Sequence, residues 1–357
     1  WGKQKVQRFK LKPNGASFEA ELEDFLVPDG PEPFRPLDIC FSPDGRHMYL
    51  ADWNFNGWVN PAVKGRLYRI TYVGNDPAVK EETKRAPQNA SVEQWAKALG
   101  HPSHAERMRA QHELAKRSDG QGVAAAITVL RDAKANEHAH VHAAWVLHAA
   151  MQTGTKPEWM KALRDAITAT GSPRVRAQLA RVLGMLRDRE SIPALTKLLQ
   201  ADPDATVRLQ SAIALGAIGE APSQAKWRSV DSGQAGVIVP RQDDKTLEAL
   251  STGNKETANA ILPGLIDSDP YVAHVAMQAL RRVNVWSDLP QQAAAHTDAK
   301  ALAGKLILAM TGVYDERAIQ ALRNYATESK VPELQSQAVA GLAEVDRRAA
   351  PYEKGWW

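Results

Sequence analysis

The sequence contains very little cysteine and no long apolar run. Cys40 is its only cysteine among 357 residues, which excludes an internal disulfide, a cysteine-based zinc site and a C-x-x-C-H haem attachment motif. We expect Cys40, within an alternating strand-like run, to pack as a small apolar side chain. No apolar run approaches the roughly 18 residues that suggest a membrane-spanning helix, so we expect no membrane insertion.

An excess of charge of one sign is also missing. The 45 basic residues exceed the 41 acidic ones by only four, and no block of Lys and Arg suited to a nucleic-acid backbone is present. We therefore expect no nucleic-acid partner. The chain begins at Trp1 without a leader-like segment, from which we expect a removed leader or a piece of a longer protein.

Known catalytic motifs are absent as well. The sequence has no nucleotide-binding loop, zinc-protease motif or nucleophile elbow. It therefore predicts no catalytic residue in this chain.

What the sequence does contain changes in character near residue 85. Before that point, Gly, Pro, Asp and aromatic residues separate short alternating runs, which predict strands at 5–11, 18–27, 36–41, 47–52 and 65–72. Turn signals follow the first and third runs, at 13–15 and 42–45. We expect the last four strands to form one antiparallel meander and the first to belong to a neighbouring unit. Residues 1–75 would then be an incomplete terminal β-propeller blade.

After residue 85 the sequence repeats with helical spacing. Residues 76–90 are polar and contain Pro, which predicts a linker. The clearest repeat units begin at Val175 and Val207, and similar units begin at Ala139, Val272, Leu302 and Leu334. A further, weaker copy is expected between Val92 and Arg117. A helix pair of this size cannot bury its apolar face alone, so stacked pairs sharing one core are expected.

The predicted fold is thus mostly α. A HEAT-like α-α superhelix, or solenoid, spans 91–350 and follows the partial β-propeller blade. An irregular insertion is expected near 221–253, and 351–357 forms a C-terminal aromatic tail. We expect Asp202 and Asp269 to cap helices, with Pro in the first helical turn.

Three closely spaced histidines are the candidates for a metal site. His138 and His142 stand four residues apart, so on a helix they would share one face, as zinc or copper ligands can. The alternative is packing or capping within a helix pair, with His140 in the slot that other repeats fill with Arg176 and Arg208. No third ligand is spaced to join them, so we predict no metal.

Those two arginines are themselves candidates for a partner-facing surface. Arg176 and Arg208 could form an exposed basic row that meets an acidic partner. The alternative is that each pairs with an acidic residue of the adjacent repeat.

A loop at a predicted strand end offers a further binding site. Asp52, Asn54 and Asn56 place one carboxylate and two amides together, which suits calcium or a sugar hydroxyl. The alternative is a turn in which these side chains cap backbone groups and Trp53 covers the sheet. Arg35 is a further binding candidate of the same kind.

Several strings together resemble the last propeller blade and HEAT repeats of large bacterial membrane-bound dehydrogenases. They are Arg35-Pro36-Leu37-Asp38, Ser42-Pro43-Asp44-Gly45, Tyr49-Leu50-Ala51-Asp52-Trp53, Gly65-Arg66-Leu67-Tyr68-Arg69-Ile70, His142-Ala143-Ala144-Trp145-Val146-Leu147, Asp269-Pro270-Tyr271-Val272-Ala273-His274 and the run from Tyr352 to Trp357. In that family a sugar-dehydrogenase-like β-propeller precedes HEAT repeats, and a cytochrome c domain follows them.

The resemblance carries several implications. The parent protein would oxidise a sugar or alcohol and pass electrons to haem, with haem c or a quinone cofactor, and calcium, in its other parts. This chain would hold no cofactor and would act as a scaffold for its missing propeller and cytochrome domains, in the periplasm or at the cell surface. The alternative is a free-standing HEAT-repeat adaptor that binds a separate protein on its concave face.

Overall fold

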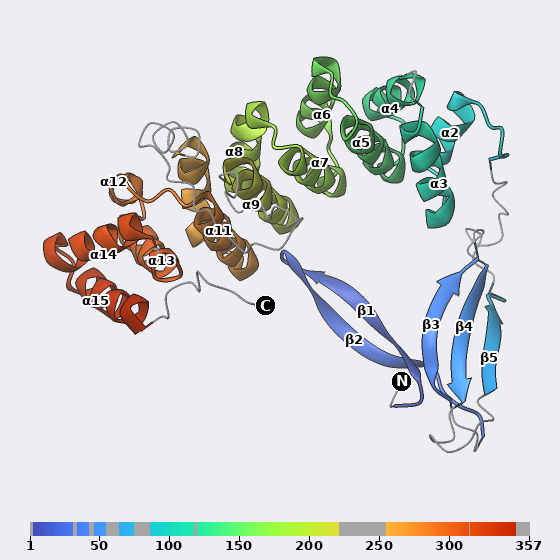
Figure 1. Ribbon diagram of the computed structural model, residues 1–357, viewed down its shortest axis with the longest axis horizontal. Coiled ribbons are helices and arrows are strands. Elements are labelled where there is room, and N and C mark those ends of the chain that lie inside the picture. Colours follow the sequence, from blue (N-terminus) through green and yellow to red (C-terminus); the bar gives the residue numbers. More distant parts are fainter. Residues whose placement is uncertain are drawn as a thin grey trace, which may run out of the picture. The chain divides into compact units, whose positions relative to one another are not determined.

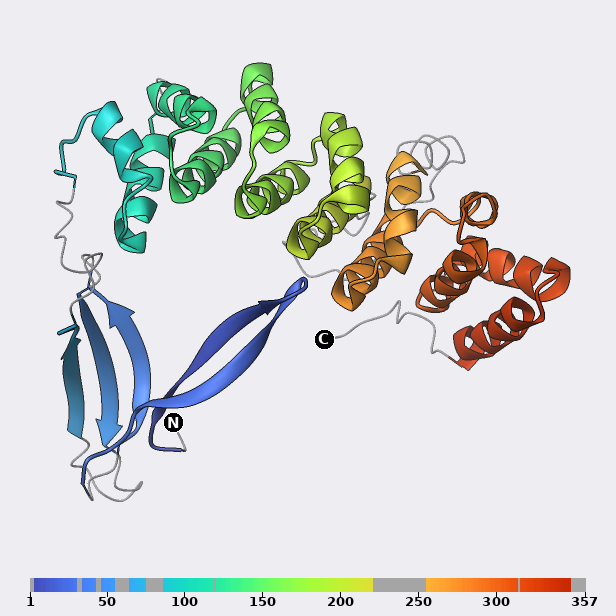
Figure 2. The same ribbon diagram turned by 180° about the vertical axis from the view of Figure 1, so that it is seen from behind.

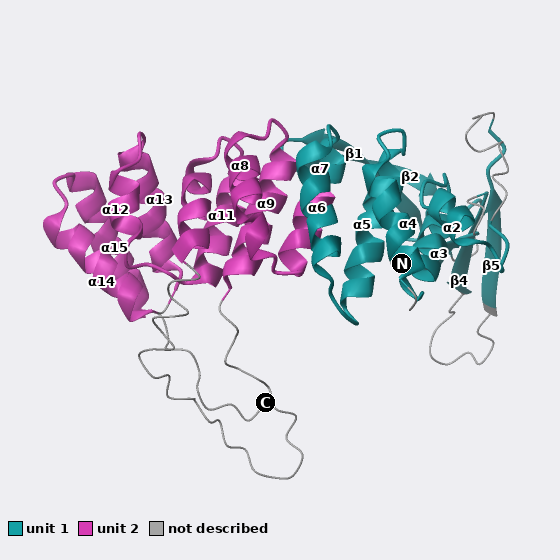
Figure 3. Cartoon of the chain, turned by 90° about the horizontal axis from the view of Figure 1, so that it is seen from above, with its two compact units in different colours: residues 1–175 teal, residues 176–357 magenta. Residues whose placement is uncertain are grey.

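The computed structural model describes residues 3–30, 34–42, 46–54, 64–74, 86–117, 120–220, 255–313 and 315–347. Contacts divide the chain into two compact units, Trp1–Val175 and Arg176–Trp357, which Figure 3 colours separately. The predicted insertion at 221–253 and tail at 351–357 lie outside the described residues, as does most of the predicted linker.

The first unit begins with five antiparallel strands (Figure 1). They are β1 (Val6–Asn14), β2 (Ser17–Leu26), β3 (Pro36–Phe41), β4 (His47–Asn54) and β5 (Lys64–Thr71). All five strands were predicted, but the predicted grouping is wrong. β1 pairs with β2 in a two-stranded sheet, and β3, β4 and β5 form a separate three-stranded sheet in that order.

Local sequence explains why β2 pairs with β1 instead of joining a four-stranded meander. Gly15 adopts the left-handed conformation, with φ of 56°, and closes a tight hairpin. The strands alternate so that Lys10 pairs with Glu21 on one face while Phe9 pairs with Leu22 on the other. A short connection makes this pairing entropically cheap. The hairpin is therefore set by its own turn and cross-strand pairs.

Cys40 is exposed on β3, so the prediction that it packs as a small apolar side chain is wrong. Its cross-strand partner is Tyr49. Met48 and Leu50 are buried on the opposite face of the three-stranded sheet. Because side chains alternate between the two faces along β3, Cys40 points away from them.

Six helices follow within the described residues of the first unit, and the last of them extends into the second. They are α2 (Val92–Ala98), α3 (His104–Ala115), α4 (Gln121–Arg131), α5 (Glu137–Met151), α6 (Pro157–Ala169) and α7 (Pro173–Met185). The expected early repeat copy is confirmed as α2 and α3. Ser91 and Gln94 form a capping box that starts α2, and Asn136 caps α5.

The second unit is also helical. Its elements are η1 (Arg189–Ser191), α8 (Ile192–Ala201), α9 (Ala205–Gly219), η2 (Leu262–Ile266), α11 (Pro270–Val283), α12 (Leu289–Ala294), α13 (Ala299–Thr311), α14 (Glu316–Glu328) and α15 (Pro332–Arg347). Within this unit α9, α11 and α13 stack on one side, and α8 and α12 lie on the other (Figure 2).

The predicted repeat positions form the core of a helical solenoid with HEAT-like repeats. The residues that begin the repeat units are all buried: Ala139, Val175, Val207, Val272, Leu302 and Leu334. Each lies in the first turns of a stacked helix, with the apolar residue eight positions later on the same face. The sequence periodicity therefore located the core correctly.

Small residues set the distance between stacked helices in the second unit. A Cβ atom added to Gly184 of α7 would lie 2.6 Å from the Cα of Ala214 on α9. A Cβ on Gly216 of α9 would lie 2.7 Å from the Cβ of Ala279 on α11. The helices thus pack with almost no side chain between them.

One of the two expected helix caps is confirmed. The side chain of Asp269 accepts hydrogen bonds from the backbone N–H groups of Tyr271 and Val272 at the start of α11. The other prediction is wrong, because Asp204 rather than Asp202 caps α9. Pro203 stands before the helix instead of in its first turn, which moves the cap two residues onward.

Candidate functional site

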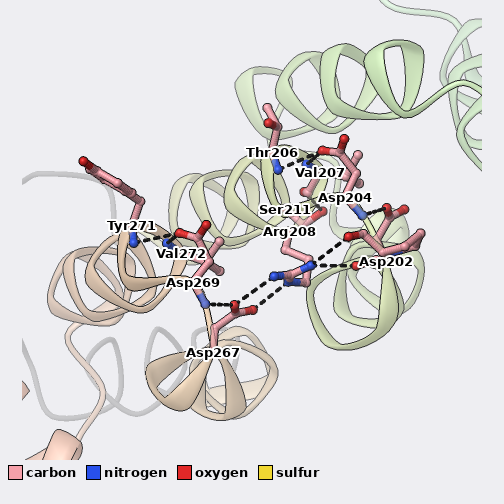
Figure 4. Close-up of polar contacts among 11 residues, drawn as sticks. Asp202, Asp204, Thr206, Val207, Arg208, Ser211, Asp267, Asp269, Tyr271 and Val272 are labelled. Carbon is pink, nitrogen blue, oxygen red and sulfur yellow. Dashed lines mark hydrogen bonds and ion pairs between the residues drawn. The ribbon is translucent and has the colours of Figure 1, made fainter. Parts of the chain in front are cut away.

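Two buried Asp–Arg pairs connect successive repeats of the second unit. Arg176 donates from Nε to Asp202 Oδ2 at 2.7 Å and from Nη2 to Asp202 Oδ1 at 3.0 Å. Arg208 binds Asp267 with the same two distances (Figure 4). Both pairs have the bidentate geometry that makes Arg–carboxylate contacts strong.

Each of these aspartates also organises the turn in which it lies. Asp202 Oδ1 accepts from the backbone N–H of Asp204 at 3.0 Å, and Asp267 Oδ1 accepts from that of Asp269 at 2.8 Å. Arg208 also donates from Nη1 to the carbonyl oxygen of Asp202 at 2.9 Å, as Figure 4 shows. One guanidinium therefore ties the turn before its own helix to the turn of the next repeat.

The ion pairing considered for the two arginines is therefore present. The Arg208 side chain is 14% exposed and that of Asp267 is 8% exposed. The hydrogen bond to Asp267 is the main cause that raises the pKa of Arg208 above its ordinary value. Contact of Arg176 or Arg208 with a partner remains a prediction, and it would use the small exposed part of each side chain.

A hollow of about 640 Å³ lies beside the second pair. Asp202, Arg208, Asp267, Ser268 and His296 contribute its polar lining. Arg208 and Asp267 bind each other, and the carboxylate of Asp202 binds Arg176, so these groups offer little to an ionic ligand. The two ion pairs thus join successive repeats of the stack.

A buried polar cluster in the first unit holds one of the predicted histidines. His142 Nε2 accepts from Arg107 Nε at 3.2 Å, and its Nδ1 lies 2.8 Å from Gln111 Oε1. These partners require a neutral ring that donates from Nδ1. The pKa of His142 is lowered to about 4, mainly by burial and next by the positive charge of Arg107.

This cluster leaves no free ring nitrogen on His142 for a metal ion. His138 is half-buried. Its pKa is lowered mainly by burial and next by the positive charge of Arg107. His140 lies 3.0 Å from the backbone oxygen of Asp132 through its Nε2. Across the described ranges, no group of three or more His, Cys, Asp or Glu residues is arranged to hold a metal ion.

Asp52 is buried in the three-stranded sheet, where protein groups already bind its carboxylate. Its Oδ1 accepts from the backbone N–H of Arg35 at 2.5 Å, and its Oδ2 accepts from Arg66 Nε at 2.6 Å. The backbone of Trp53 donates back to the carbonyl oxygen of Arg35 at 3.1 Å. The structure thus joins Arg35 and Asp52 through the main chain, as in the backbone-capping alternative.

The two amides predicted beside Asp52 are placed only in part. Asn54 is the last residue of β4 and pairs with Lys64 in the register. Asn56 lies outside the described residues. Calcium or sugar binding by this loop remains a prediction.

The hairpin has one charged face and one uncovered apolar face. The charged face carries ion pairs such as Lys10–Glu23 at 2.7 Å. On the apolar face, Phe9 is 60% exposed, and Leu11, Phe18 and Leu22 are also at least half exposed. An isolated two-stranded hairpin is marginally stable in water, so this face is a candidate interaction surface.

No described helix combines the length and apolar character needed to cross a membrane. A second hollow, of about 410 Å³, lies between the end of β2 and the three-stranded sheet, and apolar residues including Phe34 and Leu50 line most of it.

Comparison with known proteins supports the helical part of the fold. Residues 160–227 match the family model for HEAT repeats. No curated protein matches the chain.

Three solved structures are similar over most of the chain. An engineered protein shares 19% identity, with 71% of this chain and 96% of that chain covered, at a TM-score of 0.33. Human deoxyhypusine hydroxylase in complex with glycerol shares 17% identity, with 72% of this chain and 96% of that chain covered, at a TM-score of 0.29. The HEAT-like repeats protein from the archaeon Thermococcus onnurineus NA1 shares 12% identity, with 71% of this chain and 87% of that chain covered, at a TM-score of 0.30.

Two residues that complete these clusters, Arg107 and Arg66, were not predicted from the sequence. Arg107 stands four positions after the helix-preceding Ser103, as Arg208 stands four after the cap Asp204. That spacing could have identified Arg107 as another turn-binding arginine. Arg66 carried no comparable signal, because its contact with Asp52 depends on the register between β4 and β5.

Proposed function

We propose that this chain is a scaffold and protein-interaction segment of a larger oxidoreductase and performs no catalysis by itself. In this proposal a β-propeller precedes the HEAT repeats, a cytochrome domain follows them, and the parent protein oxidises a sugar or alcohol outside the cytoplasm. Haem c or a quinone cofactor, and calcium, would lie in the other domains. The HEAT-like repeats themselves provide the scaffold architecture.

The uncovered apolar face of the hairpin carries the proposal. Phe9, Leu11, Phe18 and Leu22 lie on one face of β1 and β2, and their exposure is unfavourable unless another part of a β-structure covers them. Leu37 and Phe41 of the three-stranded sheet are exposed as well. Additional strands from the same protein would cover such faces, which supports a place at the end of a larger β-domain.

The flanking sequence of the parent gene provides the first test. We expect propeller-like strand repeats before Trp1 and a C-x-x-C-H motif after Trp357. Absence of both would overturn the oxidoreductase proposal and leave the alternative of a free-standing adaptor. In a dye-reduction assay with sugars and alcohols, we expect no turnover from this chain alone, and robust turnover would contradict the non-catalytic role.

Hydrogen exchange provides a second test on the protein itself. Backbone amides of β1 and β2 should exchange quickly in this chain and be protected when the flanking sequence is expressed with it. Leu22→Lys should abolish that added protection because it places a charge on the apolar face. Glu21→Lys, on the opposite face, is the matched control and should retain the protection. Equal effects of the two variants would contradict docking through the apolar face.

A further inference from the structure

One strip of the second unit faces neither the core nor a neighbouring helix. On α9, Ala214 contacts α7 and Gly216 contacts α11. Helical periodicity places Thr206, Gln210 and Ile213 between these two directions, and all three side chains are half-buried. The exposed side of α9 therefore lies along this row.

The same register continues on the helices beside α9. On α11, Ala279 faces α9, while Arg281 donates to the carbonyl oxygen of Ala309 on α13 at 2.9 Å. The equivalent exposed row can therefore be assigned on each helix. We call the combined surface the inner strip, comprising Arg181, Met185, Thr206, Gln210, Ile213, Tyr271, Val275, Gln278, Arg282, Lys305 and Leu308.

The inner strip carries large apolar side chains in contact with solvent. Met185 is 52% exposed, Tyr271 is 54% exposed and Leu308 is 49% exposed. They come from three different helices, α7, α11 and α13. They occupy different positions along these helices but lie in the same exposed row, and several apolar side chains exposed on one face are typical of an interaction surface.

Positively charged side chains lie in the same strip. Arg181, Arg282 and Lys305 lie in the inner strip, and Arg187 follows α7 at its edge. Glu220, at the end of α9, pairs with two of these arginines: its Oε2 lies 2.9 Å from Arg187 Nη2 and 3.2 Å from Arg282 Nη2. One carboxylate thus serves two cations, so the group of Arg187, Glu220 and Arg282 keeps a net positive charge.

We propose that the inner strip binds an acidic peptide segment of a partner protein that also carries apolar side chains. Carboxylates of the segment pair with Arg282 and Lys305, while its apolar residues cover Met185, Tyr271 and Leu308. This inference rests on the interaction role proposed above and names the chemistry of the partner. The mixture of apolar and cationic groups favours a peptide over a nucleic acid, whose binding surfaces are more uniformly basic.

Fluorescence anisotropy on the full chain tests the proposal. The probe is a labelled peptide of Asp and Glu interspersed with Leu and Phe, compared with a peptide in which Lys replaces each acidic residue. We expect the acidic peptide to bind and added salt to weaken it. The double substitution Arg282→Glu and Lys305→Glu should weaken binding by about tenfold or more.

Matched variants separate the inner strip from general charge effects. Lys197→Glu with Arg323→Glu makes the same charge change on the exposed sides of α8 and α14, and it should leave the affinity almost unchanged. Leu308→Ser should weaken binding without any change in charge. Circular dichroism establishes that each variant is folded, and Lys305→Glu alone replaces the double substitution if that does not fold.

Three outcomes would overturn the proposal. They are equal binding of the acidic and basic peptides, equal weakening by the strip and control substitutions, and tighter binding of a single-stranded DNA oligonucleotide than of the acidic peptide. None of them depends on flanking sequence, so failure here is distinguishable from failure of the oxidoreductase proposal.

Discussion

Removing the carboxylate of Asp267 should destabilise the second unit substantially. Asp267→Ala leaves the Arg208 guanidinium mostly buried, with 14% of the side chain exposed, and without its bidentate partner. It also removes the acceptor for the Asp269 backbone N–H, 2.8 Å away. Breaking a buried ion pair on one side costs about 3 kcal/mol at the lower end of the usual range. We use the lower end because Arg208 keeps its bonds to two backbone carbonyls.

Urea denaturation followed by circular dichroism measures this change. A loss of about 3 kcal/mol should lower the urea midpoint by roughly 1 M or more. Asp165→Ala is the control, because its ion pair with Lys161 is largely exposed and should contribute less than about 0.5 kcal/mol. The double substitution Arg208→Met and Asp267→Leu should recover most of the stability, since no unpaired buried charge remains.

Equal losses of unfolding free energy in Asp267→Ala and Asp165→Ala would contradict a stabilising role for the Arg208–Asp267 pair. Simple additivity of Arg208→Met and Asp267→Leu would also contradict it, because residues in one ion pair should show a coupling energy.

Two further predictions concern packing and pH. Gly184→Ala should destabilise the protein by about 1–2 kcal/mol in urea denaturation, because the new methyl group meets the backbone of Ala214. Gly154→Ala is the control and should be nearly neutral, because a Cβ atom at Gly154 would have no other atom within 4 Å. The free energy of unfolding should fall by about 3 kcal/mol as the pH drops from about 6.5 towards 4. The reason is that the pKa of His142 is lowered to about 4 in the folded protein, so the unfolded chain takes up the proton at a higher pH. Replacement by His142→Gln should flatten this dependence, and an unchanged slope in pH-dependent denaturation would contradict the assignment.

Features that repeat along the chain were predictable from the sequence. Val175 and Val207 begin units with the same helical spacing, so a shared core followed from periodicity. The strands were likewise predictable from alternation. Their grouping was not, because the pairing of β1 with β2 depends on the conformation of Gly15 and on competition between pairing partners.

Contacts between distant residues were harder to predict. Arg107 reaches His142 from 35 residues away, and a single sequence gives no direct sign of such a contact. Asp202 was expected to cap a helix, but the turn that follows Pro203 assigns this role to Asp204. The Asp–X–Asp spacing at 202–204 and 267–269 divides two tasks between two carboxylates, one binding arginine and one capping the helix.

The two Asp–Arg pairs also bear on how the chain accommodates insertions. Arg176 and Asp202 are 26 residues apart, while Arg208 and Asp267 are 59 apart, yet both pairs have the same geometry. Loop-closure entropy grows only with the logarithm of length, so the longer separation costs about 0.7 kcal/mol more. One bidentate pair is enough to offset that cost. The connection between α9 and η2 is therefore a position where the protein can gain or lose sequence while its repeats keep the same register.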